Sequence, residues 1–285
     1  MIAPPNLLSD SLLVDARTYK VDESRILNPD DSALCRLAVK SIVTGMAEVL
    51  TGDDQSDPVG AALAIPIYRN HAIISIAVLA IAPKSAGTGV FEIWEPVDPY
   101  EELRLRGGYF AQLERFSNVS SFVRFEKGNG LPGQVWSLAK SVIHDDLPNH
   151  VGFLRAAGAS AGLLSTAIGI PVINQTLLSA VVMISSSSNP IAKAFEIWTV
   201  EEGRFVLDSS AYQSDGESGR IALGSTLSLG EGLPGLARQH EGAVTTDSTT
   251  ALASGRVDGQ PTFSGGLAIP FYVGNELNSV ATLCF

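Results

Sequence analysis

Charged residues are scarce in this chain, at 17% of 285 residues, against about 25% in an average soluble protein. Basic residues are the scarcer sign, because 19 Lys and Arg stand beside 30 Asp and Glu and leave a net charge of −11. No consecutive run of basic residues occurs. Nucleic acids and anionic membranes are bound through clustered Lys and Arg. The composition therefore predicts no nucleic-acid partner and no attachment to an anionic membrane.

Long apolar runs and cysteines are also few. The longest apolar stretch covers residues 72–82, which is short for a membrane-spanning helix of about 20 residues, and its Ile and Val content favours a buried strand. The two cysteines, Cys35 and Cys284, provide no disulfide framework. Residues 1–5 lack the basic and apolar segments of a secretory signal. We therefore expect a soluble, cytoplasmic protein without membrane insertion.

What the chain does contain is internal repetition. Three short motifs recur roughly 100 residues apart, which is the size of a whole domain and too long for a solenoid repeat. The recurring segments are residues 63–68, 168–173 and 267–272 around a central Ile-Pro, 91–94 and 195–198 with Phe-Glu-Ile-Trp, and 128–133 and 230–235 with Gly-x-Gly-Leu-Pro-Gly. The repetition predicts three related domains in tandem.

The spacing of the repeats places these domains at residues 1–85, 90–188 and 194–285. The first copy has no Gly-rich loop and is the degenerate one. Its residues 35–43 align with residues 135–143, where we expect a helix followed by a strand. The segments between copies are too short for a long connecting helix. We therefore expect the three copies to lie close together.

The second copy is the most complete and predicts the order of the elements. A hairpin around residues 91–106 precedes a helix at 133–140, a strand at 141–144, a helical piece around 153–156 and a final hairpin at 166–185. The order is strand, strand, helix, strand, helix, strand, strand. This order indicates an α+β domain with helices over an antiparallel sheet. The third copy repeats it, with its last hairpin turn at residues 273–276.

The Gly-rich loop of the second copy permits two interpretations. Gly-x-Gly-x-x-Gly before a helix, with Asp145 some way beyond it, is the pattern of a dinucleotide-binding fold. The helix after the loop is too short for the crossover that a parallel sheet needs. We therefore favour glycines that permit a tight turn and a close helix start.

Several motifs in one order carry a family resemblance. Residues 125–136, 140–147, 153–155 and 162–171 resemble a GAF domain, and the third copy has matching segments at 229–235, 243–247 and 265–270 with Arg256 between them. The resemblance covers nearly all of the second and third copies. It implies a six-stranded antiparallel sheet with helices on both sides and a small-molecule pocket over one face.

Mapped onto this chain, the resemblance implies a set of ligand-binding candidates that combine a few charges with apolar walls, as pockets do. They are Trp136, His144, Asp145, Asp146, Phe153, Arg155 and Ser165 in the second copy and Thr246, Asp247, Arg256 and Ser264 in the third. A structural interpretation stays open for each. In that interpretation Trp136 belongs to the core, and the Asp145–Asp146 pair caps a helix that begins near Pro148.

The sequence also departs from known members of the family. The motif of cyclic-nucleotide-binding members is absent, and no His follows Cys35 as in bilin-binding members. Free methionine sulfoxide reductases of this fold need clustered cysteines, whereas Cys35 and Cys284 belong to different copies. His144, Asp145 and His150 supply metal-ligating atoms, but we favour a solvated loop. We expect no cofactor and no metal.

These observations predict a non-enzymatic sensory or regulatory protein. It would bind a small-molecule ligand, whose identity the sequence does not give, and signal through a protein partner or a second copy of the chain. One alternative is a protein-interaction scaffold whose pockets are filled by its own side chains. The other is a nucleotide-dependent or redox enzyme, which the Gly-rich loop alone supports.

Overall fold

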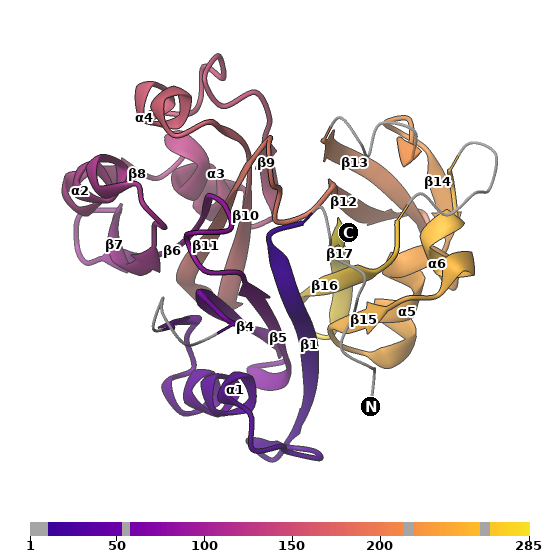
Figure 1. Ribbon diagram of the computed structural model, residues 1–285. Helices are drawn as coiled ribbons and strands as arrows, with labels where there is room; N and C mark the ends of the chain where they lie inside the picture. Colours follow the sequence, from indigo (N-terminus) through magenta and orange to yellow (C-terminus); the bar gives the residue numbers. More distant parts are fainter. Residues whose placement is uncertain (1–10, 53–57, 214–218, 257–262) are drawn as a thin grey trace.

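The computed structural model describes residues 11–52, 58–213, 219–256 and 263–285. Its strands form three antiparallel sheets, of five, six and six strands in chain order. Each sheet is taken here with the helices that cover it as the first, second or third unit. Figure 1 shows the three units around a common centre, with their helices on the outside.

The second unit has the most regular elements. Its sheet has the strand order β8-β7-β6-β11-β10-β9, and every neighbouring pair is antiparallel. The elements are β6 (Gly89–Val97), β7 (Glu102–Tyr109), α2 (Glu114–Phe122), β8 (Arg124–Glu126), α3 (Gly130–Leu138), β9 (Val142–His144), α4 (Ala156–Ala161), β10 (Leu164–Asn174) and β11 (Thr176–Ser186).

The third unit repeats this topology. Its sheet has the order β14-β13-β12-β17-β16-β15, so each strand has a counterpart in the second unit. The elements are β12 (Ala194–Glu201), β13 (Arg204–Tyr212), β14 (Thr226–Ser228), α5 (Gly232–His240), β15 (Val244–Thr246), α6 (Thr249–Ala253), β16 (Gly266–Val273) and β17 (Glu276–Cys284).

The first unit is reduced to five strands in the order β2-β1-β5-β4-β3 and, among its described residues, one helix. The helix begins after Ser32, whose hydroxyl accepts a hydrogen bond from the Cys35 backbone N–H at 3.1 Å. It ends at Gly45, with the left-handed φ of 68° that glycine favours. The elements are β1 (Leu13–Asp22), β2 (Arg25–Ile26), α1 (Ala33–Thr44), β3 (Glu48–Thr51), β4 (Ala61–Arg69) and β5 (Ala72–Ile81).

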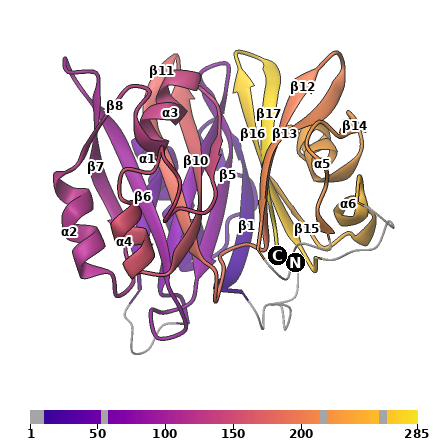
Figure 2. The ribbon, with the colours of Figure 1, turned by 90° about the horizontal axis from the view of Figure 1, so that it is seen from above.

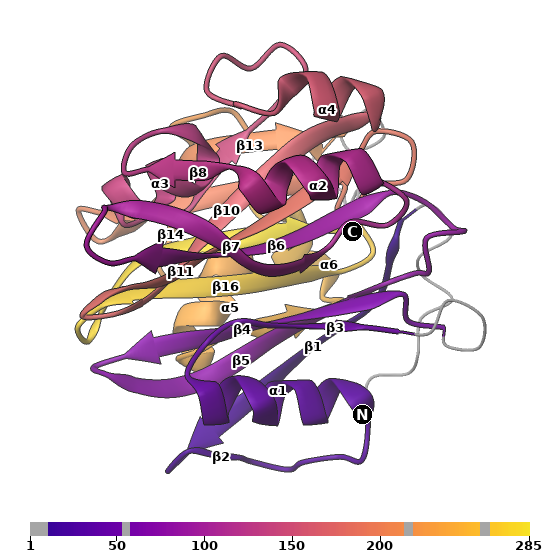
Figure 3. The same ribbon diagram turned by 90° about the vertical axis from the view of Figure 1, so that its left-hand side faces the viewer.

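Each sheet buries both of its faces, but against different neighbours. Along β6, Val90 and Trp94 belong to a core shared with α2, α3 and α4, whereas Phe91 and Ile93 belong to a core shared with the other two sheets. This alternation follows from the period of two along a strand. The helices therefore cover the outer face of each sheet, and the inner faces of the three sheets pack on one another (Figure 3).

The three units contact one another in a ring. β3 of the first unit contacts β7 of the second, β9 of the second contacts β13 of the third, and β15 of the third contacts β1 of the first. β3, β9 and β15 are equivalent strands, so the same edge of each unit meets the first hairpin of the next. Figure 1 looks along this ring, and Figure 2 shows it from the side, with the second unit at the left and the third at the right. The ring has the head-to-tail geometry of a cyclic trimer, built here within one chain.

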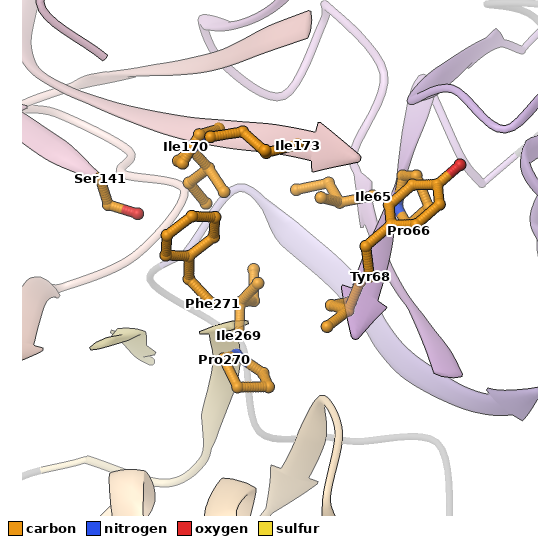
Figure 4. Close-up of a pocket in the computed structure, with 11 residues that line it drawn as sticks. Ile65, Pro66, Tyr68, Ser141, Ile170, Ile173, Ile269, Pro270 and Phe271 are labelled. Atoms are coloured by element: carbon orange, nitrogen blue, oxygen red, sulfur yellow. The ribbon is translucent and has the colours of Figure 1, made fainter. Parts of the chain in front are cut away.

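The recurring Ile-Pro motif lies at the centre of this ring. It falls on the equivalent strands β4, β10 and β16, and Figure 4 shows Ile65, Ile170 and Ile269 with their neighbours converging on one another. A small pocket of about 20 Å³ lies between them, with space for about one water molecule. Its lining residues are Ile65, Pro66, Ile67, Tyr68, Ser141, Ile170, Pro171, Ile173, Ile269, Pro270 and Phe271. The motif that reveals the repeat is thus the one that joins the three sheets.

The α+β class and the antiparallel sheets expected from the sequence are confirmed, with six strands in the second and third units. The hairpin turn expected at residues 273–276 lies between β16 and β17. Among the described residues, no helix is long and apolar enough to cross a membrane. Residues 1–5, which we interpreted as lacking a secretory signal, lie outside the described residues.

Three expectations need correction. Residues 114–122 form α2, a helix that the predicted order of elements does not contain. Helices were implied on both sides of each sheet, but the inner side is covered by the other sheets. The alignment of the first copy is also shifted: pairing puts Glu48 opposite Ala64 and Val142 opposite Gly169, so Glu48, not Ile42, matches Val142. The cause is α1, which continues to Thr44 and is longer than α3.

Candidate functional site

Alternation along β6 directs one carboxylate toward the helix-covered face of the second unit. Val90 and Trp94 lie on that face, and Glu92 lies between them with 0% of its surface exposed. A buried carboxylate needs an opposite charge or several hydrogen-bond donors, because its desolvation is costly. Glu92 therefore requires a buried partner of this kind.

Arg155, in the turn before α4, supplies the opposite charge. Its Nη2 donates to Glu92 Oε2 at 2.8 Å, and its Nη1 donates to Oε1, which makes a bidentate pair. Arg155 Nη1 also donates to Ser120 Oγ at 2.6 Å, and Trp94 Nε1 donates to Glu92 Oε2 at 3.0 Å. Only 2% of the Arg155 side chain is exposed. The two charges neutralise each other in the interior.

Aromatic rings surround the guanidinium. The distance from Arg155 Cζ to the ring centroid is 4.5 Å for Phe116, 5.3 Å for Phe153, 5.4 Å for Trp94 and 5.6 Å for Phe125. All four lie within the range of attraction between a cation and a ring face. We name these groups the cation box; its members are Glu92, Trp94, Phe116, Ser120, Phe125 and Phe153.

The third unit repeats the ion pair. Glu196 on β12 matches Glu92, and Arg256 Nη1 donates to its Oε1 at 2.9 Å. Trp198 Nε1 donates to Glu196 Oε2 at 3.2 Å, and Thr282 Oγ1 donates to the same atom at 3.1 Å. Tyr212 donates to Glu196 Oε1 at 2.8 Å. Burial and the neighbouring Glu196 carboxylate raise the pKa of the Tyr212 hydroxyl.

The two arginines are held differently. Arg256 donates to backbone carbonyls, from Nε to Leu252 at 2.6 Å and from Nη1 to Gly219, and its Nη2 lies 3.3 Å from Cys284 Sγ. Among the described residues, the Arg155 guanidinium hydrogen-bonds to side chains alone, and its Nε is buried without a partner. Backbone carbonyls therefore fix Arg256 in place, whereas Arg155 lies in a site formed by side chains.

The first unit has a different charge at this position. Pairing places Arg17 opposite Val78 and Glu92 opposite Val182, so Arg17 takes the place of the glutamate. Its Nε donates to Asp15 Oδ2 at 2.9 Å and its Nη1 to Asp30 Oδ2 at 3.1 Å. The first unit therefore has an arginine, and no glutamate, at the position equivalent to Glu92.

His144 lies beside the cation box. It is buried, its Nε2 is 2.9 Å from Gln134 Oε1, and its ring stacks on His150 at a centroid distance of 3.8 Å. Burial, followed by the charge of His150, lowers the pKa of His144 to about 4. The ring is therefore neutral at neutral pH. The rings of His144 and Phe153 are nearly perpendicular, with centroids 6.4 Å apart, so His144 lies against a wall of the box.

The structure brings only some of the expected second-copy residues together. Phe153 and Arg155 meet at the cation box, with His144 against Phe153. Trp136 lies half-buried on α3, with Lys127 Nζ 5.4 Å from its ring centroid. It lies outside the box.

The remaining expected residues of the second copy lie on the surface or between units. Asp145 and Asp146 are exposed. Asp145 Oδ1 accepts a hydrogen bond from Thr166 at 2.7 Å. Ser165 Oγ is 3.5 Å from Gln213 Nε2 of the third unit. The interpretation of Asp145–Asp146 as a helix cap is wrong, because the chain from there to α4 forms turns.

In the third unit, Arg256 alone of the four expected residues enters the buried site. Thr246 Oγ1 accepts from the Ser248 N–H at 3.0 Å, and Asp247 is exposed. Ser264 Oγ donates to the Phe285 carbonyl at 3.3 Å. The other three residues thus lie in the chain segments around the site.

The Gly-rich loop makes a turn, as we favoured, and not a dinucleotide site. Gly128 and Gly130 have φ of 92° and 63°, and a Cβ on Gly133 would lie 2.2 Å from the Glu126 carbonyl oxygen. The strand after α3, β9, pairs antiparallel with β10. A dinucleotide fold needs a parallel strand there, so the pattern match is structural.

The described residues contain no group of three His, Cys, Asp or Glu side chains that could hold a metal. His144 and His150 stack on each other instead of pointing at a shared ligand. Cys35 and Cys284 are buried free thiols in different units. Burial, followed by the nearby Glu196 carboxylate, raises the pKa of the Cys284 thiol, which disfavours its nucleophilic form.

Sequence reasoning missed the carboxylates that organise both sites. Glu92 and Glu196 stand inside the repeated Phe-Glu-Ile-Trp motif, yet we used the motif only to find the repeat. A glutamate within an apolar strand is itself a signal, because buried Glu is rare without a partner. Phe116, on the helix that we did not predict, carried no comparable signal.

No family model matches the chain, and no curated protein matches it. Similar solved structures include the GAF domain of a phosphoenolpyruvate-protein phosphotransferase from Coxiella burnetii, at 23% identity over 33% of this chain and 55% of that one, with a TM-score of 0.28. A free methionine-R-sulfoxide reductase from Neisseria meningitidis, in complex with its substrate, matches at 16% identity over 36% of this chain and 53% of that one, with a TM-score of 0.28.

A third similar structure is a GAF domain/HD domain protein from Geobacter sulfurreducens, at 12% identity over 35% of this chain and 65% of that one, with a TM-score of 0.30. The match spans less than two thirds of each of these three chains. At these TM-scores, the description of the fold rests on the strand order of the three sheets.

Proposed function

We propose that the chain is a non-enzymatic sensory or regulatory protein of the GAF type, with domains at residues 1–85, 90–188 and 194–285. Its second unit would bind a small ligand and pass the change to a protein partner. The observation that supports this proposal is the cation box. It is a buried site with the Glu92 carboxylate on one side and aromatic rings around it, and the side chain of Arg155 fills it.

A ligand that displaces Arg155 would also move the turn that carries it. Val151 and Leu154 in that turn are exposed apolar residues, as is Leu163 just after α4. Movement of the turn would change the position of these three side chains on the surface. A protein partner or a second copy of the chain that binds this surface would then bind more tightly or more weakly.

A scaffold without a ligand is the second candidate. It is favoured by Arg256, which fills the third unit's site and is fixed there by backbone carbonyls. In this view both buried arginines are permanent parts of the core. The enzyme alternative loses its support, because the Gly-rich loop is a turn.

Native mass spectrometry of freshly purified full-length protein, followed by denaturation of the same sample, separates the two candidates. A mass excess that disappears on denaturation supports ligand binding. Thermal-shift screening of a metabolite mixture provides the second readout. A clean mass together with an unchanged melting temperature across the screen would reject the sensory proposal and leave the scaffold.

A further inference from the structure

We propose that the cation box binds an organic cation with a guanidinium or methylated ammonium head, and that Arg155 occupies the box as a tethered competitor. This inference rests on the proposed ligand-sensing function and names the chemical class of the ligand. Four ring faces within 6 Å of one positive charge form the kind of cage that recognises such cations.

Every contact of the Arg155 guanidinium is one that a free cation could make. Glu92 provides a bidentate acceptor, Ser120 provides a hydroxyl, and the rings provide apolar walls with negative faces. These groups lie on β6, α2, β8 and the turn before Arg155, so most of the box remains when Arg155 leaves. The exchange replaces one cation by another, and Glu92 is never left buried and unpaired.

The tether is weakly anchored to the rest of the unit. Arg155 lies in a run of turns between β9 and α4, and α4 has six residues and no side-chain cap. Val151 is fully exposed and Leu154 is 60% exposed. A segment with so few buried side chains opens at low free-energy cost. Its buried side chains are Leu147, Phe153 and Arg155; Phe153 and Arg155 lie next to α4 and would move together.

The third unit provides an internal contrast. Among the described residues, Arg256 has one cation–ring contact, with Phe263 at 4.5 Å, and it donates to two backbone carbonyls. A free cation would have to reproduce those backbone bonds with fewer ring faces around it than in the second unit. We therefore infer that cation exchange is confined to the second unit.

The test is a binding experiment on the full-length Arg155→Ala variant with methylguanidinium and tetramethylammonium. Binding is measured by calorimetry, by the change in intrinsic tryptophan fluorescence, to which Trp94 in the box contributes, and by the melting temperature. We expect saturable binding at millimolar concentration to Arg155→Ala, and binding at least about tenfold weaker to the wild type, because the fold holds Arg155 in the box with its bidentate pair to Glu92 already formed and a free cation has to displace it.

Three controls are matched to this variant. Arg256→Ala removes the equivalent arginine but leaves the second unit intact, and should bind both cations no more tightly than the wild type. Glu92→Gln combined with Arg155→Ala removes the carboxylate and should lose the binding. Urea at the same concentration has the planar shape of guanidinium without its charge, and should not bind.

If Arg155→Ala does not fold alone, recovery of its native circular dichroism by methylguanidinium, but not by urea, supports the proposal. The proposal is overturned if the folded Arg155→Ala variant binds neither cation. It is also overturned if urea binds this variant as the cations do, or if Arg256→Ala binds the cations as tightly as Arg155→Ala. A retained non-cationic ligand in the wild type would overturn this inference and keep the sensory function. If the cations bind Arg155→Ala but not the wild type at any concentration, the result supports the box as a cation-binding site and rejects the sensory function.

Discussion

Arg155 and Glu92 are buried together, and a buried charge is tolerated only beside its partner. A pair of this kind adds little net stability compared with apolar residues of the same size, but loss of one member leaves the other uncompensated. The stability of the second unit should therefore respond to the pairing of the two residues more than to either residue alone.

Arg155→Met should lower the free energy of unfolding by about 3–5 kcal/mol, because Glu92 remains charged in the interior. Urea denaturation followed by circular dichroism measures the loss. The Glu92→Gln/Arg155→Met double variant removes both charges and should recover most of it. Equal stability of the single and double variants would contradict an energetically coupled pair.

His144 should make stability depend on pH. Its pKa in the folded protein is about 4, below the ordinary value of about 6.5 for an unfolded chain. Below about pH 6.5 the unfolded state binds a proton that the folded state excludes. Stability is thus fully present above that pH and decreases toward pH 4, by at most about 3 kcal/mol. Urea denaturation at several pH values measures the slope.

A His144→Gln variant should flatten this part of the profile. The matched control is His240→Gln, at an exposed position on α5, which should leave the slope unchanged. The assignment to His144 fails if the profile of His144→Gln keeps the wild-type slope between pH 6.5 and 4.

At the scale of elements, the repeated hairpins were predictable because their apolar strands and turns are strong local signals. α2 was not predictable, since residues 114–122 are rich in Ser and Asn and the helix has no side-chain cap. Its place is fixed by tertiary contact, through Phe116 in the outer core. The end of α1 was also predicted wrongly. Aligning residues 35–43 with 135–143 assumed helices of equal length, whereas α1 is longer than α3.

Some residues of the candidate site were predictable from the sequence and others were not. Arg155, Arg256 and Phe153 were identified, because the family resemblance points to their segments. Glu92 and the remaining rings come from elements far away in the sequence. Their convergence depends on strand register and on α2, which local patterns do not determine.

The turn into α3 offers a test at this scale. Gly133→Ala should lower the free energy of unfolding by more than about 2 kcal/mol, because the new Cβ would lie 2.2 Å from the Glu126 carbonyl oxygen. Chemical denaturation measures the change. Gly107→Ala on β7 is the matched control, since no atom lies within 4 Å of its Cβ position. Equal effects at both glycines would contradict the close approach.

At the scale of the whole molecule, one apolar core joins all three sheets. We expect the chain to unfold in a single cooperative transition, with coincident calorimetric, circular dichroism and tryptophan fluorescence curves. Ile170→Ala, at the centre of the ring, should lower stability by about 2–4 kcal/mol without splitting the transition. Separate transitions for individual units would show that the shared core does not couple them.

The ring also changes how the assembly depends on dilution. Three separate subunits in a head-to-tail trimer meet by diffusion, so their association is lost as the protein is diluted. Here the second and third units are joined by the short segment 187–193, and units joined by a short linker meet at an effective concentration in the millimolar range. The central contacts between β4, β10 and β16 therefore persist in a single molecule, whatever the amount of protein present.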